Sequence, residues 1–189
     1  REEPLTNLSQ FITCDMLNKE FMKLNKYSLA GTDEQDWFDY AGLADRRLPE
    51  LLSQYKSGRY KAPPIRRVYI PKGKTDKRPL GIPTIEDKVL QSAVRRVLET
   101  IYEEIFKDFS YGFRRNRSCH QAIEYMFKRV SFGGMRYIID ADIQNYFGSI
   151  NHGQMRKFLD QRVKDGKMRK MLDKWLKAGI LEDEILSYP

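Results

Sequence analysis

Two aspartates stand two positions apart after a short apolar run, and this spacing is the strongest sign of chemistry in the chain. Residues 135–150 read MRYIIDADIQNYFGSI, so Asp140 and Asp142 follow the run at 137–139. A short isoleucine-rich run bounded by glycines favours a buried strand over a helix. Because a carboxylate is costly to bury unless it is paired or metal-bound, a divalent cation is one explanation for the two acids. The alternative is that the acids cap the next turn or pair with an arginine.

Composition narrows the class of protein and of partner. The 189 residues are 41% hydrophobic and 32% charged, which is typical of a globular domain or slightly more than one. No apolar run approaches the roughly 20 residues that span a bilayer, so we expect no membrane partner. Cys14 and Cys119 give neither a disulfide framework nor a zinc spacing, so we expect a reducing, cytoplasmic location. The formal net charge of +8 favours nucleic acid as the partner.

Positive charge is concentrated between residues 56 and 78. Against one acid, Asp76, this range contains Lys56, Arg59, Lys61, Arg66, Arg67, Lys72, Lys74, Lys77 and Arg78. The runs IRRVYIP and RPLGIP flank KGKTDK and predict a β-hairpin with Gly73 in its loop. A polyphosphate would relieve the repulsion between the cations, and a solvated charged loop is the alternative. Tyr60 and Tyr69 add flat surfaces on which bases or sugars can rest.

Apolar periodicity predicts the helices that position these segments. We expect helical structure over residues 5–27 and 37–55, with Pro49 in a first turn. A capping box of Thr84 and Asp87 predicts a helix that keeps one apolar face as far as residue 106. A second box, Ser118 with Gln121, predicts a helix through residue 130. Its expected packing residues are Ala122, Ile123, Met126 and Phe127.

The last helices are expected over residues 154–163 and 167–178, with Gly179 as the stop and no later strand to pair beside residues 137–139. The second has an apolar stripe of Met168, Met171, Leu172, Trp175 and Leu176. Its opposite face carries Lys167, Lys170, Lys174 and Lys177. Such a lysine row is typical of a solvated surface, and weak contact with a nucleic-acid backbone is the alternative. His120 and His152 have no partner acid or cysteine nearby, which favours structural roles.

Four blocks, in order, resemble the reverse transcriptases of the maturase type that bacterial and organellar group II introns encode. They are residues 66–91, 110–123 (SYGFRRNRSCHQAI), 138–152 (IIDADIQNYFGSINH) and 174–179 (KWLKAG). The resemblance implies an α+β right-hand polymerase fold with fingers and an incomplete palm. This fold would be mostly helical, with the basic hairpin and a short antiparallel palm sheet. We expect residues 1–85 to form an N-terminal extension and fingers, and residues 86–189 the fingers–palm helices and partial palm.

The same resemblance assigns site residues. Asp142 would be the first catalytic metal ligand, the carbonyl of Ile143 would add a second bond to metal, and Asp140 would support them. Phe147, with Tyr146 behind it, would be the gate against a ribonucleotide 2′-hydroxyl. Lys72 and Arg78 would lie along the triphosphate of the incoming nucleotide. Further contacts to nucleic acid are expected from Arg66, Arg67, Lys74, Lys77, Arg114, Arg115 and Arg117.

The implied activity is RNA-directed DNA synthesis together with assistance to intron splicing in the bacterial cytoplasm. The implied partners are the intron RNA template, a DNA primer and deoxynucleoside triphosphates, with two Mg²⁺ ions in the complete enzyme. The family's Tyr-Ala-Asp-Asp turn is absent from the sequence, and Gly148 and Asn151 replace the usual acids. We therefore expect the 189 residues to bind RNA without extending a primer, and to self-associate through exposed palm or fingers surfaces.

Two alternatives stay open at this point. Asp140-Ala-Asp142 also fits the Asp-X-Asp motif with which a glycosyltransferase holds the manganese of a nucleotide sugar. That class would leave the basic hairpin unexplained. The second alternative is an RNA-binding splicing factor with a vestigial polymerase site, against which intact Asp142 and Phe147 argue.

Overall fold

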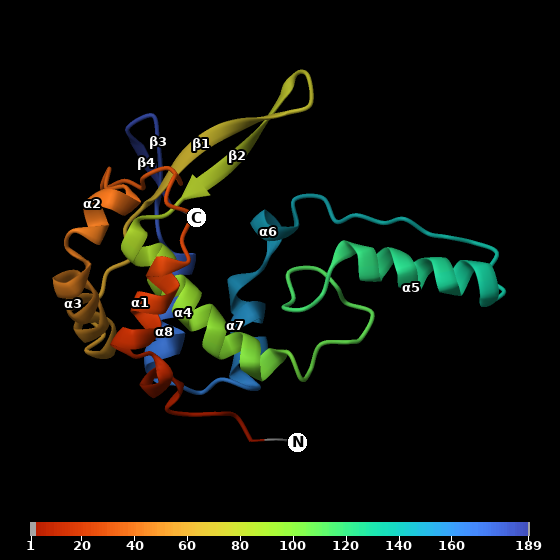
Figure 1. The fold of residues 1–189 in the computed structure, drawn as a ribbon, viewed down its shortest axis with the longest axis horizontal. Coiled ribbons are helices and arrows are strands. Elements are labelled where there is room, and N and C mark those ends of the chain that lie inside the picture. Colours follow the sequence, from red (N-terminus) through yellow and green to blue (C-terminus); the bar gives the residue numbers. More distant parts are fainter. Residues whose placement is uncertain (1–2, 189) are drawn as a thin grey trace.

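The chain is a mostly helical α+β protein, which confirms the predicted class. The computed structural model describes residues 3–188. In chain order its elements are η1 (Leu8–Phe11), α1 (Cys14–Met22), α2 (Trp37–Ala41), α3 (Ala44–Lys56), β1 (Ile65–Lys72), β2 (Asp76–Ile82), α4 (Ile85–Tyr102), α5 (Cys119–Phe132), α6 (Tyr146–Ser149), α7 (His152–Asp160), α8 (Gly166–Leu176), β3 (Ile180–Glu182) and β4 (Ile185–Ser187). Figure 1 shows the strands at one end of the helices and α5 at the far side. Within residues 3–188, no helix is long and apolar enough to cross a membrane.

The helical body, which we define as η1 with α1, α2, α3, α4 and α8, contains the hydrophobic core. Leu90 of α4 is fully buried in one cluster with Leu17 of α1, Leu51 of α3 and Met168 of α8. Full burial of such a side chain is worth about 1.5–3 kcal/mol. The cluster draws on both sides of residue 85, so the segments 1–85 and 86–189 share one core. The expected division there stays a prediction.

Three helix predictions differ from the structure in extent. Of residues 5–27, only η1 and α1 are helical, and α1 ends at Met22. Residues 37–55 form two helices, because the chain turns at residues 42–43, and apolar periodicity does not report such a turn. Pro49 therefore lies inside α3, which begins at Ala44, rather than in a first turn. Because proline has no backbone N–H, the helical hydrogen bond from residue 49 to the carbonyl of Asp45 cannot form. At the other end, α4 stops at Tyr102, and Phe106 beyond it is 45% exposed.

The sheet has the strand order β2-β1-β3-β4. β1 and β2 are antiparallel, β1 and β3 are parallel, and β3 and β4 are antiparallel. The β3–β4 hairpin was not expected from the sequence, and neither of its strands pairs with residues 137–139. Its two turn residues, Asp183 and Glu184, have φ values of 46° and 66°. A turn of this kind is normally signalled by Asn-Gly or Asp-Gly, and Asp-Glu gives no such signal.

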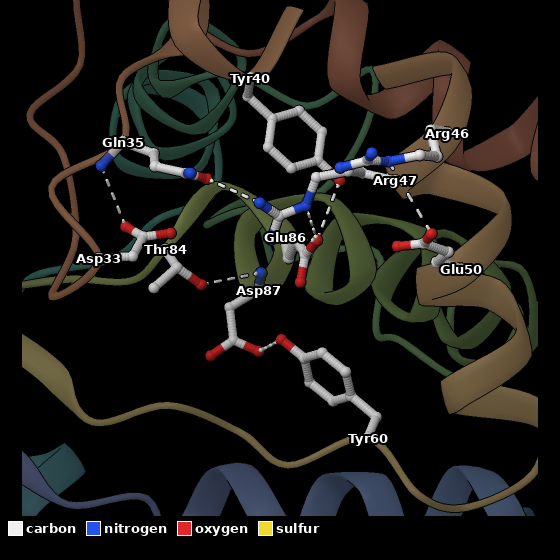
Figure 2. A network of polar contacts seen from close by, with 10 residues as sticks. All are labelled: Asp33, Gln35, Tyr40, Arg46, Arg47, Glu50, Tyr60, Thr84, Glu86 and Asp87. Carbon is white, nitrogen blue, oxygen red and sulfur yellow. Dashed lines mark hydrogen bonds and ion pairs between the residues drawn. The ribbon is translucent and has the colours of Figure 1, made fainter. Parts of the chain in front are cut away.

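A buried acid, Asp87, ties α4 to two other parts of the body. Its Oδ1 accepts hydrogen bonds from the Tyr60 hydroxyl at 2.9 Å, which Figure 2 shows, and from Trp175 Nε1 at 2.8 Å. Thr84 Oγ1 accepts from the backbone N–H of Asp87, as predicted for the cap. The carboxylate itself faces the interior. Burial raises the pKa of Asp87, and the hydrogen bonds from Trp175 and Tyr60 oppose this rise.

Beside this acid, Glu86 joins the start of α4 to α2 and α3. Its Oε1 accepts from Arg47 Nε at 3.0 Å and from the Tyr40 hydroxyl at 3.3 Å (Figure 2). Arg47 also donates to Gln35 Oε1 at 3.2 Å. The first turn of α4 is therefore fixed by polar contacts on both sides, directly after the hairpin that precedes it.

The arm, which we define as residues 119–149, stands outside the core. Ser118 and Gln121 form the predicted capping box, so α5 begins where expected. However, α5 has no buried residue, and Ile123 and Phe127 are 58% and 62% exposed. The predicted packing of Ala122, Ile123, Met126 and Phe127 in a core is therefore wrong. Figure 1 shows the reason: α5 projects away from the body, and an apolar stripe is buried only where another element covers it.

Candidate nucleic-acid interface

The predicted hairpin forms, and its register puts two of its cations on one face. Arg78 pairs with Ile70 and Lys72 pairs with Asp76. Lys72 and Arg78 are therefore diagonal neighbours on the same face of an antiparallel pair. Gly73 turns the chain with a φ of +72°, a value that glycine adopts without strain. Within the part of the chain described, no ion pair or side-chain hydrogen bond engages any of the exposed tip cations Lys72, Lys74, Lys77 and Arg78.

The base of the hairpin is held by an acid from β3. Glu182 Oε2 accepts from Arg67 Nη1 at 3.1 Å, and Glu182 Oε1 accepts a hydrogen bond from the Tyr69 hydroxyl. The Tyr69 hydrogen bond lowers the pKa of Glu182, and Arg67 adds to this effect. Arg66 makes a long contact, 3.5 Å, with the carbonyl of Ala30. Cationic groups near the base are thus partly engaged, and the free charge is concentrated at the tip.

The three arginines after α4 have unequal freedom. The Arg114 side chain is 5% exposed, lies 2.6 Å from Glu103 Oε1 and also donates to two backbone carbonyls of its own loop. This contact lowers the pKa of Glu103. Arg117 lies 3.6 Å from Asp108 Oδ1. Arg115 is exposed and, among residues 3–188, has no ion-pair partner. Arg114 therefore organises the loop, and Arg115 has the charge that is free for a partner.

The predicted strand before the two aspartates is wrong. Residues 134–143 contain no strand, and Tyr137 and Ile139 are 87% and 90% exposed. A strand needs a neighbour for its backbone hydrogen bonds and a cover for its apolar face. In the described chain, β1–β4 form their own sheet and none of them runs beside this segment. Asp140 and Asp142 are exposed as a result.

The other expected residues of this segment are also exposed. Ile143 is 65% exposed and Phe147 is 80% exposed at the start of the short helix α6. The rings of Tyr146 and Phe147 meet edge to face, with centroids 5.3 Å apart. The structure thus puts Phe147 against Tyr146. In Figure 1 the segment from α5 to α6 lies apart from the hairpin tip.

A cluster of exposed cations, such as the one at this hairpin tip, is typical of the class of proteins that bind nucleic acid. Within that class, the family described as reverse transcriptase (RNA-dependent DNA polymerase) matches residues 70–186, more than half of the chain. The chain belongs to this reverse transcriptase family, which confirms the resemblance seen in its sequence blocks. The match gives no support to the glycosyltransferase alternative.

Curated relatives connect the chain with introns. The group II intron-encoded protein LtrA of Lactococcus lactis subsp. cremoris is 40% identical over 162 residues, which is 84% of this chain and 27% of that protein. The putative COX1/OXI3 intron 1 protein of Saccharomyces cerevisiae is 34% identical over 137 residues, which is 72% of this chain and 16% of that protein. The chain therefore spans about a quarter or less of the length of these relatives.

A solved structure supports the fold. A chain of a partial Cas6-RT-Cas1–Cas2 complex superposes with a TM-score of 0.52 at 19% identity. The superposition covers 96% of this chain and 30% of that chain. At this identity the likeness concerns the fold alone, and it agrees with the fingers–palm architecture that the sequence predicted.

Reverse transcriptases generally use Mg²⁺, so the oxygen ligands that this chain offers are of interest. Mg²⁺ takes oxygen ligands in near-octahedral geometry. The chain offers Asp140, Asp142 and the carbonyl of Ile143 on one exposed segment. Among residues 3–188 there is no group of three or more His, Cys, Asp or Glu side chains that could hold a metal ion. These residues do not by themselves fit a complete magnesium site.

Sequence reasoning missed two residues that position the interface. Glu182 fixes the hairpin base, but a lone acid in a three-residue apolar run gives no sign of its partner. Lys174 was expected on a solvated lysine row. Its Nζ instead donates to the carbonyls of Gly58 and Tyr60 at 2.7 and 2.5 Å, which ties α8 to the segment before the hairpin. No local pattern distinguishes this lysine from its neighbours on the helix.

Proposed function

We propose that this chain supplies the fingers and part of the palm of a group II intron reverse transcriptase. In this proposal the parent protein is an RNA-directed DNA polymerase that also binds intron RNA as a splicing maturase. Its partners are the intron RNA template, a DNA primer and deoxynucleoside triphosphates, in the bacterial cytoplasm. The proposal rests on Lys72 and Arg78, which have no ion-pair partner among the described residues and share one face of a hairpin whose tip lies within the family match.

In the proposed reaction, a primer 3′-oxygen forms a bond to the α-phosphorus of the incoming nucleotide while the bond to pyrophosphate breaks. Lys72 and Arg78 offset the charge of the triphosphate and hold it in line, and such positioning supplies much of the rate. Phe147 would exclude nucleotides that carry a 2′-hydroxyl. Asp142, with the Ile143 carbonyl, would contribute to a magnesium site that the described residues do not complete.

The remaining cations would follow the nucleic-acid backbone. Lys74, Lys77 and Arg115 are exposed and unpaired within the described chain, so they offer full charges to phosphates. Arg66, Arg67, Arg114 and Arg117 already have protein contacts, and their proposed role is to position the interface as well as to bind. The exposed apolar faces of the arm would favour self-association of this chain at high concentration.

The hairpin test is a double substitution, Lys72→Gln with Arg78→Gln. If both cations meet phosphates, RNA affinity falls, and the salt slope of log K against log[salt] becomes shallower by about 1.4. Filter binding at two or more salt concentrations measures both quantities. The matched control, Lys107→Gln with Lys157→Gln, removes the same charge from exposed lysines without ion-pair partners in the described chain. Equal losses in the two variants would show that net charge, rather than the hairpin, governs binding.

Primer extension tests the incomplete metal site. Because the described carboxylates do not complete a magnesium site, we expect the 189-residue chain to bind an RNA template but add no nucleotide to an annealed primer in Mg²⁺. Gel analysis of a labelled primer measures this. Extension by the purified chain would contradict our description of the site, whereas absence of RNA binding would contradict the proposed partner.

A further inference from the structure

A lysine-lined cavity lies in the helical body, between the end of α3, the start of α8 and the segment around η1. Its volume is about 590 Å³, within the range of small-molecule sites. Five lysines line it: Lys56, Lys164, Lys167, Lys170 and Lys174. Figure 1 shows η1 and the hairpin at opposite ends of the body, so this cavity is separate from the hairpin tip.

No ion pair within the described residues neutralises the lysines of the cavity. None of the five lysines forms an ion pair in the part of the chain that the structure describes. Among them, Lys174 alone makes side-chain hydrogen bonds within the described residues, and these go to the uncharged carbonyls of Gly58 and Tyr60. Like charges that line one concave surface repel each other, and an anion in the cavity would relieve this repulsion.

The single acid of the lining, Asp165, is committed to backbone groups. Its Oδ1 accepts from the N–H groups of Lys167 and Met168, both at 2.9 Å, and its Oδ2 accepts from the N–H of Ser9 at 2.8 Å. Burial opposes ionisation of Asp165, but the hydrogen bonds from Met168 and Ser9 outweigh it and lower its pKa. This carboxylate therefore caps α8 and offsets the charge of the five lysines only in part.

A second and independent observation points to a ligand. Tyr55 lines the cavity, is 2% exposed, and its hydroxyl has no hydrogen-bond partner. A buried hydroxyl without a partner costs free energy, and nearly all such groups in proteins are paired. Tyr55 belongs to the wall of a cationic cavity, and the acceptor that such a cavity attracts is an anionic oxygen.

We propose that this cavity binds a phosphate group of RNA, as a second backbone contact separate from the hairpin. The lysines supply the charge and the Tyr55 hydroxyl donates a hydrogen bond to a phosphate oxygen. The RNA source rests on the proposed function. The ability of the cavity to bind phosphate does not rest on the proposed function, because a free pyrophosphate would contact the same groups.

The first experiment measures the site without RNA. Titration of the chain with inorganic pyrophosphate is followed by two-dimensional NMR of its amides, with shifts expected at residues 164–170 and around Tyr55. Tyr55→Phe should keep or raise the unfolding temperature of the free chain, because it removes a buried hydroxyl that has no partner among the described residues. It should also weaken pyrophosphate binding severalfold. Unchanged affinity in Tyr55→Phe, or shifts confined to the hairpin, would overturn the proposed site.

The second experiment identifies RNA as the source. The triple variant Lys164→Gln, Lys167→Gln, Lys170→Gln spares Lys174, which has a structural role. Its salt slope for RNA binding should become shallower by about 2. The control Lys107→Gln, Lys157→Gln, Lys177→Gln removes the same charge from lysines outside the cavity and should change the slope less.

The outcomes separate the two proposals. Equal slopes for the triple variant and its control, with hairpin variants still weakened, would overturn the cavity as an RNA contact and leave the proposed function intact. Absence of RNA binding by the parent chain, with pyrophosphate shifts at the cavity, would overturn the proposed function and the RNA source. That result would keep the phosphate site.

Discussion

The helical body and the arm contain helices with similar amphipathic sequences, but the helix in the body is buried and the helix in the arm is exposed. α4 in the body and α5 in the arm are both amphipathic, and each begins at a hydroxyl cap. Along α4, Val89, Leu90 and Ala93 are fully buried, whereas α5 buries none of its residues. Local sequence therefore accounts for both helices. Burial depends on neighbouring elements: α4 packs with α1, α3 and α8, and no element of the described chain covers α5 in this way.

This difference separates two sources of stability. A body helix gains from side chains removed from water, at about 25 cal/mol per Å² of apolar surface. An arm helix has its cap, its backbone bonds and surface pairs such as Lys128–Glu124 at 2.7 Å, worth a few tenths of a kcal/mol each. The following substitutions test whether the body and the arm differ as this comparison requires.

The largest contrast is expected from truncation of one apolar side chain in each region. Leu90→Ala should lower the free energy of unfolding by about 2–5 kcal/mol, because it leaves a cavity in the core. Ile123→Ala, at a position 58% exposed, should change it by less than about 0.5 kcal/mol. Urea denaturation followed by circular dichroism measures both. A loss at Ile123 as large as that at Leu90 would mean that the arm packs on a core in solution.

A smaller effect is expected at the buried acid of the body. Asp87→Ala leaves the Tyr60 hydroxyl and Trp175 Nε1 without an acceptor, at about 1–3 kcal/mol for each donor. Asp87→Asn keeps a side-chain oxygen and should lose less. Denaturation of both variants beside the parent measures the difference. Equal losses would show that the charge of Asp87, rather than its acceptor atom, stabilises the junction.

The same acid predicts a direction of pH dependence. Burial raises the folded-state pKa of Asp87 above its ordinary value of 3.8, so folding favours the protonated form. Its contribution to stability is therefore fully present below pH 3.8 and is lost as the pH rises through the folded-state pKa. Asp87→Asn should remove this component from a series of unfolding curves. A component that instead grows with rising pH would reverse the assigned sign.

The smallest contrast compares the two caps. Thr84→Ala should cost about 1 kcal/mol of global stability, because α4 is part of the core. Ser118→Ala should cost α5 a similar amount locally but leave global unfolding unchanged, because the arm is not buried. Amide hydrogen exchange would detect the local loss as faster exchange confined to residues 119–132. Slower folding or a lower global midpoint in Ser118→Ala would contradict the separation of arm from body.

The candidate site divides in the same way. The hairpin was predictable because alternating β-branched residues, a glycine turn and antiparallel pairing are all local, and they suffice to put Lys72 and Arg78 on one face. The conformation of the apolar run before Asp140 and Asp142 could not be predicted in this way, because such a run becomes a strand only beside another strand. The contacts of Lys174 with backbone carbonyls and of Arg114 with Glu103 join residues that no sequence pattern links.

The sequence by itself determined the family, through four blocks in order. It also determined the cationic hairpin and the starts of α4 and α5, because each of these depends on residues within a few positions of one another. Only the tertiary structure decided that α5 is exposed, that Glu182 holds the hairpin, and that lysines from α3, α8 and the loop before α8 line one cavity. The physical reason is that burial and ion pairing join residues distant in the chain. Their partners are set by packing, which no local pattern records.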